Sequence, residues 1–422
     1  MAKKEADSVT ITDGSVPLRS PRAHWITPTV AGIVLATFLS DLSHEMCTAV
    51  LPLYLSTLGL GPAALGLIEG IADFLVSLSK LLGGIVGHHV RRKRPWASLG
   101  YLVTAVATWG IGLVNGLAAL LTLRGTAWIG RGFRGPLRDH LLADAVAPTH
   151  YGRAYGLERA GDMLGAVAGP LAAALFVWAG VEFRTVILWT LAPGLLAAGS
   201  LFFFTRERDA TISLTPQDAD PKPRRSFPRL FWMFLAGVFL FGLGDFSRTF
   251  LIWLAAKPFA ESSGPAADSI SAAVLLYTLH NLVSAAVAYP IGRLGDRGHK
   301  RQILIGGYGL GVGTNVFLAL FSQSLGWLVA IVVLSGIYIA VEETLEKAIA
   351  AELLPGELRS LGFGILACAN AVGDMASSFW VGFLLDAHQP GWAFGMAAAV
   401  GAAGTLWLAC VWKFAGVRYR QK

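Results

Sequence analysis

The chain has 422 residues, of which 54% are hydrophobic and only 14% are charged, and its formal net charge is +7. A soluble domain usually contains about 25% charged residues, so the composition argues against a soluble enzyme, a nucleic-acid-binding module and a disordered protein. A basic excess is also typical of the cytoplasmic loops of membrane proteins. We therefore predict an all-α membrane protein.

The N-terminal segment, residues 1–26, is polar and lacks the apolar core of a secretory signal peptide. We expect it to be a cytoplasmic tail, followed by a first apolar segment that is a membrane span. Cys47, Cys368 and Cys410 lie far apart, and the sequence contains no CxxC pair. This spacing predicts neither a disulfide framework nor a structural zinc site.

Membrane-spanning helices need about 20 mostly apolar residues, and twelve segments come near this requirement. Segment 206–228 separates six spans from six, and its charge and proline content predicts a flexible linker. We thus predict a six-helix bundle over 27–205, a second over 229–415 and a C-terminal tail over 416–422. The predicted spans are residues 27–57, 63–87, 96–115, 118–143, 153–180, 184–205, 229–257, 268–293, 301–321, 325–350, 359–386 and 391–415.

The distribution of Lys and Arg predicts the orientation. Basic residues concentrate in segment 91–94 after the second span, in the linker and in the C-terminal tail, whereas only Arg184 and Lys257 fall on the opposite side. The positive-inside rule then places both termini in the cytoplasm. We expect a multi-pass protein of the plasma membrane, which in a bacterium is the inner membrane.

An internal repeat relates the two halves of the sequence. Gly84 and Gly87 after the second span correspond to Gly292 and Gly295 after the eighth, at an offset of 208 residues. At the same offset, Tyr155-Gly156 corresponds to Phe363-Gly364. Two copies with six spans each keep the same orientation in the membrane, which predicts parallel repeats around an axis along the membrane normal.

Three motifs give the chain a resemblance to the major facilitator superfamily, and the resemblance covers nearly the whole sequence. The segment Arg131–Gly135 is similar to the family's R-x-x-Q-G motif in span four, with Arg134 in place of glutamine. In the loop after span two, His88 stands where the family has an acidic residue. The loop after span eight matches the family's gating motif through Gly292, Gly295, Asp296, Arg297, Lys300 and Arg301, and span five contains the antiporter-like Gly165, Gly169 and Pro170.

The resemblance implies twelve transmembrane helices in two six-helix bundles related by a parallel pseudo-twofold axis. It also implies secondary transport by alternating access, in which the Gly292–Arg301 loop gates the cytoplasmic side. More narrowly, the chain resembles a branch of permeases of which some are linked to nickel or iron export. We expect a monomer without a cofactor that binds a small-molecule or ion substrate, protons and membrane lipid, but no nucleic acid.

Ionisable residues inside the spans are candidates for coupling. A charge at the bilayer centre costs at least ~2.5–3.5 kcal/mol and normally faces a partner or a watery cavity. Asp41, His44 and Glu45 share one face of span one, and Glu69 and Asp73 lie one turn apart in span two. Because desolvation disfavours a charged carboxyl group, such residues can exchange protons near neutral pH. We predict that these five carry protons or cations.

A second set of charges is predicted to bind substrate or to tune the first set. Arg131 and Arg134 either bind an anionic substrate or hold the carboxylates of spans one and five. Charges near the cytoplasmic ends have the alternative role of structural ion pairs. The set comprises Arg131, Arg134, Glu158, Asp162, Asp245, Arg248, Glu342, Glu346 and Asp374.

These patterns predict a proton-coupled exporter of a small solute. No P-loop, HExxH or GxSxG motif occurs, so neither ATP-driven transport nor an enzyme is expected. Several acids and one histidine suit a divalent metal ion or its chelate, although the sequence defines no metal ligand set. An organic cation or drug suits the same acids, an organic anion suits the arginines, and a receptor or scaffold that does not transport is the alternative from another class.

Overall fold

The computed structural model describes the chain at residues 25–60, 62–207, 226–246, 250, 254, 266–321 and 325–419. Within these helices, nothing is described for the side chains of residues 62–67, 69, 70, 72–74, 266–273, 325, 326 and 415–419. Every regular element in the described residues is a helix, and they contain no strand. This agrees with the predicted all-α class.

The N-terminal half of the chain begins with a capped helix, because the Thr27 hydroxyl accepts a hydrogen bond from the Val30 N–H at 3.3 Å. The predicted sixth span is divided into two helices, α6 and α7, which meet at Thr190. The elements of this half are α1 (Pro28–Thr57), α2 (Pro62–His89), α3 (Arg94–Ile111), α4 (Leu117–Ala145), η1 (Pro148–His150), α5 (Tyr151–Trp178), α6 (Phe183–Trp189) and α7 (Leu191–Phe204).

In the C-terminal half, the first helix, α8, ends at Gly242, and most of the rest of the predicted seventh span, up to residue 257, lies outside the described residues. The last helix, α14, continues past residue 415, where a tail was predicted. The elements are α8 (Arg229–Gly242), α10 (Ala266–Leu294), η2 (Gly295–His299), α11 (Lys300–Phe321), α12 (Leu325–Leu353), η3 (Gly356–Leu358), α13 (Arg359–Asp386) and α14 (Pro390–Tyr419).

Length and hydropathy by themselves identify six candidate membrane spans in the described part of the chain. One of them, Val274–Phe321, runs through α10, η2 and α11. Helix α4 is 29 residues long but carries several arginines, which lower its hydropathy. The twelve-span count therefore remains a prediction. The six spans are Pro28–Thr57, Pro148–Trp178, Phe183–Phe204, Val274–Phe321, Trp327–Leu353 and Pro390–Phe414.

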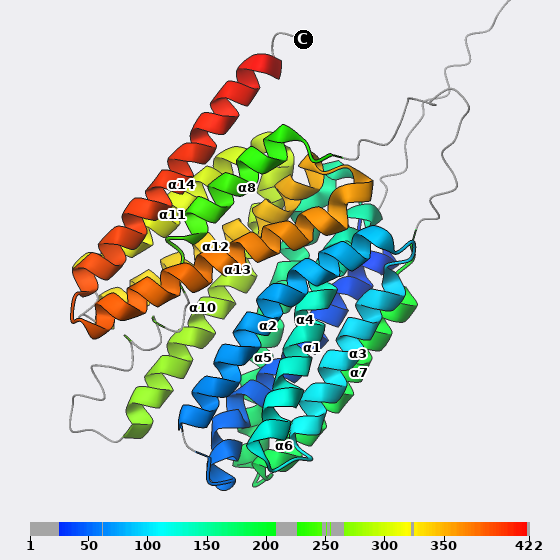
Figure 1. The fold of residues 1–422 in the computed structure, drawn as a ribbon, viewed down its shortest axis with the longest axis vertical. Coiled ribbons are helices and arrows are strands. Elements are labelled where there is room, and N and C mark those ends of the chain that lie inside the picture. Colours follow the sequence, from blue (N-terminus) through cyan, green and yellow to red (C-terminus); the bar gives the residue numbers. More distant parts are fainter. Residues whose placement is uncertain are drawn as a thin grey trace, which may run out of the picture.

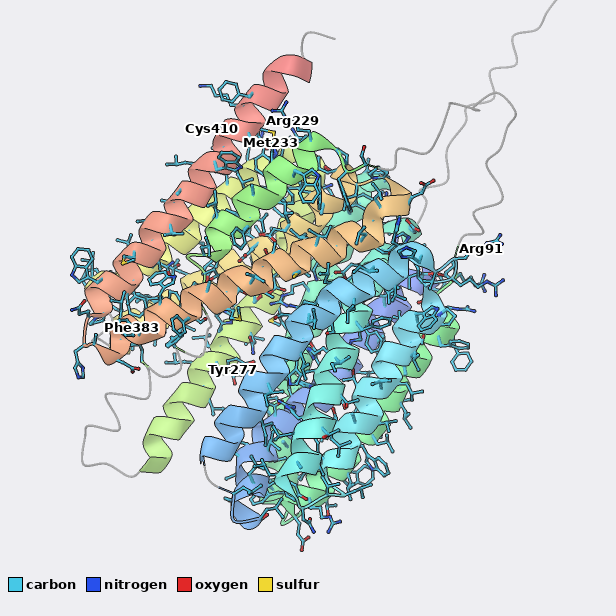
Figure 2. The ribbon with its side chains drawn as sticks, in the orientation of Figure 1. Arg91, Arg229, Met233, Tyr277, Phe383 and Cys410 are labelled. Atoms are coloured by element: carbon cyan, nitrogen blue, oxygen red, sulfur yellow. The ribbon has the colours of Figure 1, made fainter. Side chains whose placement is uncertain are left out.

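The polarity of the molecule is reversed relative to a soluble protein. Large apolar side chains cover the outside, as at Trp178 (85% exposed) and Phe383 (68% exposed, labelled in Figure 2). Charged side chains lie inside, and Asp41, Arg124 and Glu158 are each only 1% exposed. Such a surface is stable in a hydrocarbon solvent but not in water.

The two halves lie side by side and touch most extensively along two pairs of helices, α2 with α13 and α5 with α10 (Figure 1). Glycines allow both close approaches. A Cβ atom added at Gly84 would lie 2.8 Å from the Cα of Gly364, and one added at Gly292 would lie 1.9 Å from the carbonyl oxygen of Gly152. A shared apolar core continues across the boundary, where Tyr155 packs edge-on against Phe363.

The close approach of α5 and α10 predicts a strong dependence on Gly292. Gly292→Ala should lower the midpoint of thermal unfolding, because overpacking typically costs about 1–3 kcal/mol. Gly309→Ala is the matched control, since an added Cβ there has no neighbour within 4 Å and alanine favours a helix. Thermal unfolding of the two purified variants tests this, and equal midpoints would contradict the packing argument.

Candidate functional site

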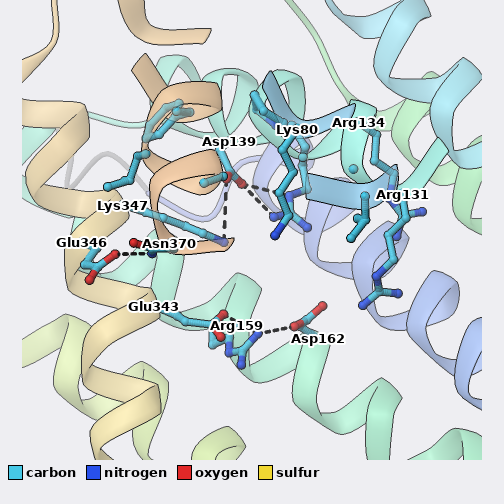
Figure 3. A pocket seen from close by; sticks show the side chains of 18 of the residues that line it. Lys80, Arg131, Arg134, Asp139, Arg159, Asp162, Glu343, Glu346, Lys347 and Asn370 are labelled. Atoms are coloured by element: carbon cyan, nitrogen blue, oxygen red, sulfur yellow. Dashed lines mark hydrogen bonds and ion pairs between the residues drawn. The ribbon is translucent and has the colours of Figure 1, made fainter. Parts of the chain in front are cut away.

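A cavity of about 340 Å³ lies between the two halves, and most of its lining side chains are charged or polar (Figure 3). The N-terminal half contributes residues of α2, α4 and α5, including Lys80, Arg131 and Asp162. The C-terminal half contributes residues of α12 and α13, together with Asp245, which follows α8. The cavity therefore has one wall from each half of the chain, and these are called the N-terminal wall and the C-terminal wall below.

The N-terminal wall is organised by arginines on one face of α4. Arg131 donates to Asp41 of α1 at 2.5 Å. Arg134 donates to the Ser40 hydroxyl at 2.6 Å, lies 4.0 Å from Asp41 and stacks over the ring of Tyr101. Charge-assisted hydrogen bonds of this kind stabilise both partners in a low-dielectric interior. The arginines thus hold the buried Asp41, which does not itself line the cavity.

Asp162 of α5 joins this group. Its carboxyl group accepts from Arg159 at 2.6 Å, and its charge interacts with the Asp41 carboxyl group. Two neighbouring carboxyl groups disfavour double ionisation, so one proton can be shared between them. Arg131 and Arg159 therefore flank a pair of acids that can hold a proton.

The antiporter-like segment brings α5 close to α1 beside these acids. A Cβ added at Gly165 would lie 2.9 Å from the Cβ of Asp41, and one added at Gly169 would lie 2.7 Å from the Cβ of Glu45. Pro170 follows inside α5, where it removes one backbone hydrogen bond. The two glycines therefore permit the contact that places Asp162 near Asp41.

Ion pairs connect the two walls beside the cavity. Arg159 lies 2.5 Å from Glu343 of α12, so it bridges the halves while it also holds Asp162. Lys347 of α12 lies 3.7 Å from both Asp139 and Glu158 of the N-terminal half. Figure 3 shows Lys347 and Asp139 facing each other from opposite sides. These contacts draw α12 towards α4 and α5.

A second group of contacts joins the halves at one end of the helices. At this end α2, α4, α10 and α12 finish, and α5 and α13 begin. The buried Asp296 carboxylate accepts from the backbone N–H groups of Gly152 at 2.8 Å and Arg153 at 3.0 Å. It thus caps the positive N-terminal end of α5. Lys300 lies 3.1 Å from Asp296 and donates to the Pro148 carbonyl at 3.3 Å.

In the N-terminal half, the position that corresponds to Asp296 is His88, which makes a different contact. His88 donates from Nδ1 to the backbone carbonyl of Glu357 at 2.9 Å, just before α13. Nearby, Arg359 donates to Asp144 at 2.5 Å. We call these contacts, together with those of Asp296 and Lys300, the end latch. Of the remaining gating-motif residues, Gly295 is buried, whereas Arg297 and Arg301 are exposed.

The polar side chains of the C-terminal wall are mainly carboxyl groups. Glu346 accepts hydrogen bonds from the Tyr308 hydroxyl and from Asn370 Nδ2, the latter at 2.8 Å. Asp245 accepts from the Tyr338 hydroxyl at 2.7 Å. Glu342 lies one turn before Glu346 on the same face of α12, and Asp374 of α13 completes the wall. This wall therefore supplies mainly acceptors.

Other predicted site residues lie away from the cavity or outside the described residues. His44 is buried edge-on against Trp128, and neither ring nitrogen has a hydrogen-bond partner within the described residues. Glu45 is half-buried on the same helix. The side chains of Glu69 and Asp73 lie outside the described part, and so does all of Arg248. The described residues contain no group of three or more His, Cys, Asp or Glu that could hold a metal ion.

Several residues that line the cavity, or that donate hydrogen bonds to its lining, were absent from the predicted site. Lys80 and Lys347 lie near helix ends, where a lysine usually reaches the interface or pairs with an acid, and both line the cavity. Tyr308 and Tyr338 give no distinctive signal, because a tyrosine in an apolar span is common. Asn370 and Glu343 were visible as polar residues within spans, but their partners lie on other helices and could not be read from spacing.

Comparison with known proteins agrees with this architecture. An uncharacterised MFS-type transporter of Methanocaldococcus jannaschii is 26% identical over 350 residues, which cover 82% of this chain and 86% of that protein. An uncharacterised protein of Mycobacterium tuberculosis is 23% identical over 372 residues, covering 86% and 87%.

Two solved structures have the same fold. The human organic anion transporter MFSD10 (TETRAN) gives a TM-score of 0.71 at 16% identity and covers 90% of this chain and 99% of its own. A bacterial homologue of the iron transporter ferroportin, in an outward-facing state, gives 0.68 at 17% identity and covers 91% and 99%. The profile of the Major Facilitator Superfamily matches residues 33–257 and 239–421. The chain is therefore a multi-pass membrane transporter that belongs to the Major Facilitator Superfamily.

Proposed function

We propose that this protein is a secondary active transporter that exports a small solute by alternating access, driven by protons. The observation that carries the proposal is a charged cavity between two halves that are themselves joined by ion pairs. Charges such as Arg159 and Glu343 are stable in this interior only while they face each other or water. A relative movement of the halves exchanges one kind of contact for the other, which is what a carrier requires.

The end latch is the proposed gate. With the termini on the cytoplasmic side, as the basic loops predict, the end latch closes the cytoplasmic end. The helix-capping contact of Asp296 supports this assignment, because separation of α5 from α10 would break two hydrogen bonds at once. The two glycine contacts lie at the same end and would separate with it.

Substitution at Asp296 tests the gate. Asp296→Asn removes the charge that caps α5 and pairs with Lys300, so the closed end should open in a larger share of molecules. The measurement is the distance between spin labels at Arg91 and Gln302, which lie in different halves. Asp296→Asn should add a longer-distance population, whereas Arg293→Gln, an exposed neighbour, should not. Identical distance distributions would exclude a gating role.

The Asp41–Asp162 pair is the proposed proton site. Arg131 and Arg159 provide positive charge on both sides, so the pair can bind or release one proton without leaving a large uncompensated charge. The Gly165 and Gly169 contacts tie this site to the packing of α5 on α1. A change of protonation can therefore be transmitted to the helix that also carries the latch contacts.

The proton site predicts a specific transport defect. Asp41→Asn keeps a hydrogen-bond acceptor for Arg131 but removes the titratable group, so solute-driven proton movement should fall at least about ten-fold. Proteoliposomes with an internal pH dye, tested against a panel of metals, drugs and metabolites, provide the measurement. Glu182→Gln, at an exposed carboxyl group, serves as the control. Unchanged proton movement in both Asp41→Asn and Glu45→Gln would rule out this assignment.

The nature of the cargo is a separate question from the gate. The sequence left a divalent metal ion or its chelate, an organic cation and an organic anion as candidates. The cavity volume of about 340 Å³ falls within the usual range for a small-molecule site. It exceeds what a bare ion needs, and this supports a molecular cargo.

A further inference from the structure

The C-terminal wall contains two buried hydrogen-bond acceptors for which the described residues provide no donor. They are Oε2 of Glu342, whose residue is only 6% exposed, and Oδ1 of Asn370. Both residues line the cavity. A buried acceptor without a donor costs about 1–3 kcal/mol, and more when it is charged. Such a cost is normally offset by a ligand, a proton or water.

The donors of this wall are already engaged with other acceptors. Tyr308 donates to Glu346, and Tyr338 donates to Asp245. Asn370 uses Nδ2 for Glu346, which fixes its amide orientation and leaves Oδ1 as an acceptor (Figure 3). The wall is therefore built to receive hydrogen-bond donors rather than to supply them.

The charges around Glu342 point in the same direction. Four further carboxyl groups, those of Asp245, Glu343, Glu346 and Asp374, line the cavity on the same wall as Glu342. An anionic ligand would meet repulsion here, whereas a cation would be attracted from several sides. A ligand that satisfies both Glu342 and Asn370 needs a positive charge together with N–H groups.

We propose that Glu342 and Asn370 bind the primary ammonium group of an organic cation, which is the cargo class of the carrier proposed above. The apolar part of the cation packs against Ile339, Phe363 and Leu366, which line the same side of the cavity. An ammonium group offers three donors in a compact point charge. Transport of the cation depends on the proposed function, but its binding does not.

Binding to the full-length protein in detergent tests the proposal. The probes are butylammonium, benzylammonium and phenylethylammonium at millimolar concentration, with benzyltrimethylammonium as a probe that has the charge but no N–H group. Titration calorimetry should show binding of at least one primary ammonium ion, with the quaternary ion at least about ten-fold weaker.

Two variants and one control locate the site. Glu342→Gln removes the charge and adds its own N–H donors, so it should weaken ammonium binding at least about ten-fold while the empty protein unfolds at an equal or higher temperature. Asn370→Ala removes one acceptor and should weaken binding several-fold. Glu182→Gln, at the exposed start of α6, should leave binding unchanged.

Several results would overturn the proposal. They are the absence of binding by all three primary ammonium ions, equal binding by the quaternary ion, and binding that Glu342→Gln does not alter. Glu342-dependent binding of Ni²⁺ or Mn²⁺ without ammonium binding would assign the wall to a metal ion instead. Ammonium binding without proton-coupled flux would support this binding site and refute the proposed carrier mechanism. Proton-coupled flux of an anion that Glu342→Gln does not alter would support the carrier mechanism and refute this binding site.

Discussion

An ionised side chain that leaves water must find an opposite charge or a set of hydrogen bonds, because the desolvation penalty in a protein interior is several kcal/mol per ion. This constraint decides the arrangement of the central helices. Asp41 is buried against Arg131, and Glu158 is buried against Arg138 at 2.8 Å. Removing one partner of such a pair would leave the charge of the other buried and unpaired. The helices that carry the two partners are therefore held in place relative to each other.

In the proposed mechanism, the same constraint makes the boundary between the halves reversible. Arg159 and Lys347 each form an ion pair with a residue of the opposite half. Water can replace that partner when the halves separate. Water cannot replace an apolar contact such as that of Tyr155 with Phe363 in the same way. Only lipid or another apolar side chain can do so. A boundary made of glycine contacts and ion pairs therefore changes its state more readily than one made of interlocked apolar side chains.

The two walls of the cavity solve the problem of buried charge differently. In the N-terminal wall, arginines face carboxyl groups, and the hydrogen bonds close on one another. In the C-terminal wall, tyrosines and Asn370 satisfy Glu346 and Asp245, whereas Glu342 keeps an oxygen without a donor in the described residues. This asymmetry fits a division of labour in which one wall handles protons and the other receives cargo. It also distinguishes the two halves, although their helices follow the same order.

The sequence by itself determined the helical class, the family resemblance and the set of charges inside the spans. These properties depend on composition, on short-range spacing and on repeated motifs, such as the glycines at Gly84 and Gly292 that recur at an offset of 208 residues. The pairing of those charges was decided only by the tertiary structure. Arg159 meets Glu343 and His88 meets the Glu357 carbonyl through contacts between distant segments, and spacing along one helix does not encode which distant helix packs against it. For the same reason, spacing along the sequence does not show that Oε2 of Glu342 lacks a donor among the described residues.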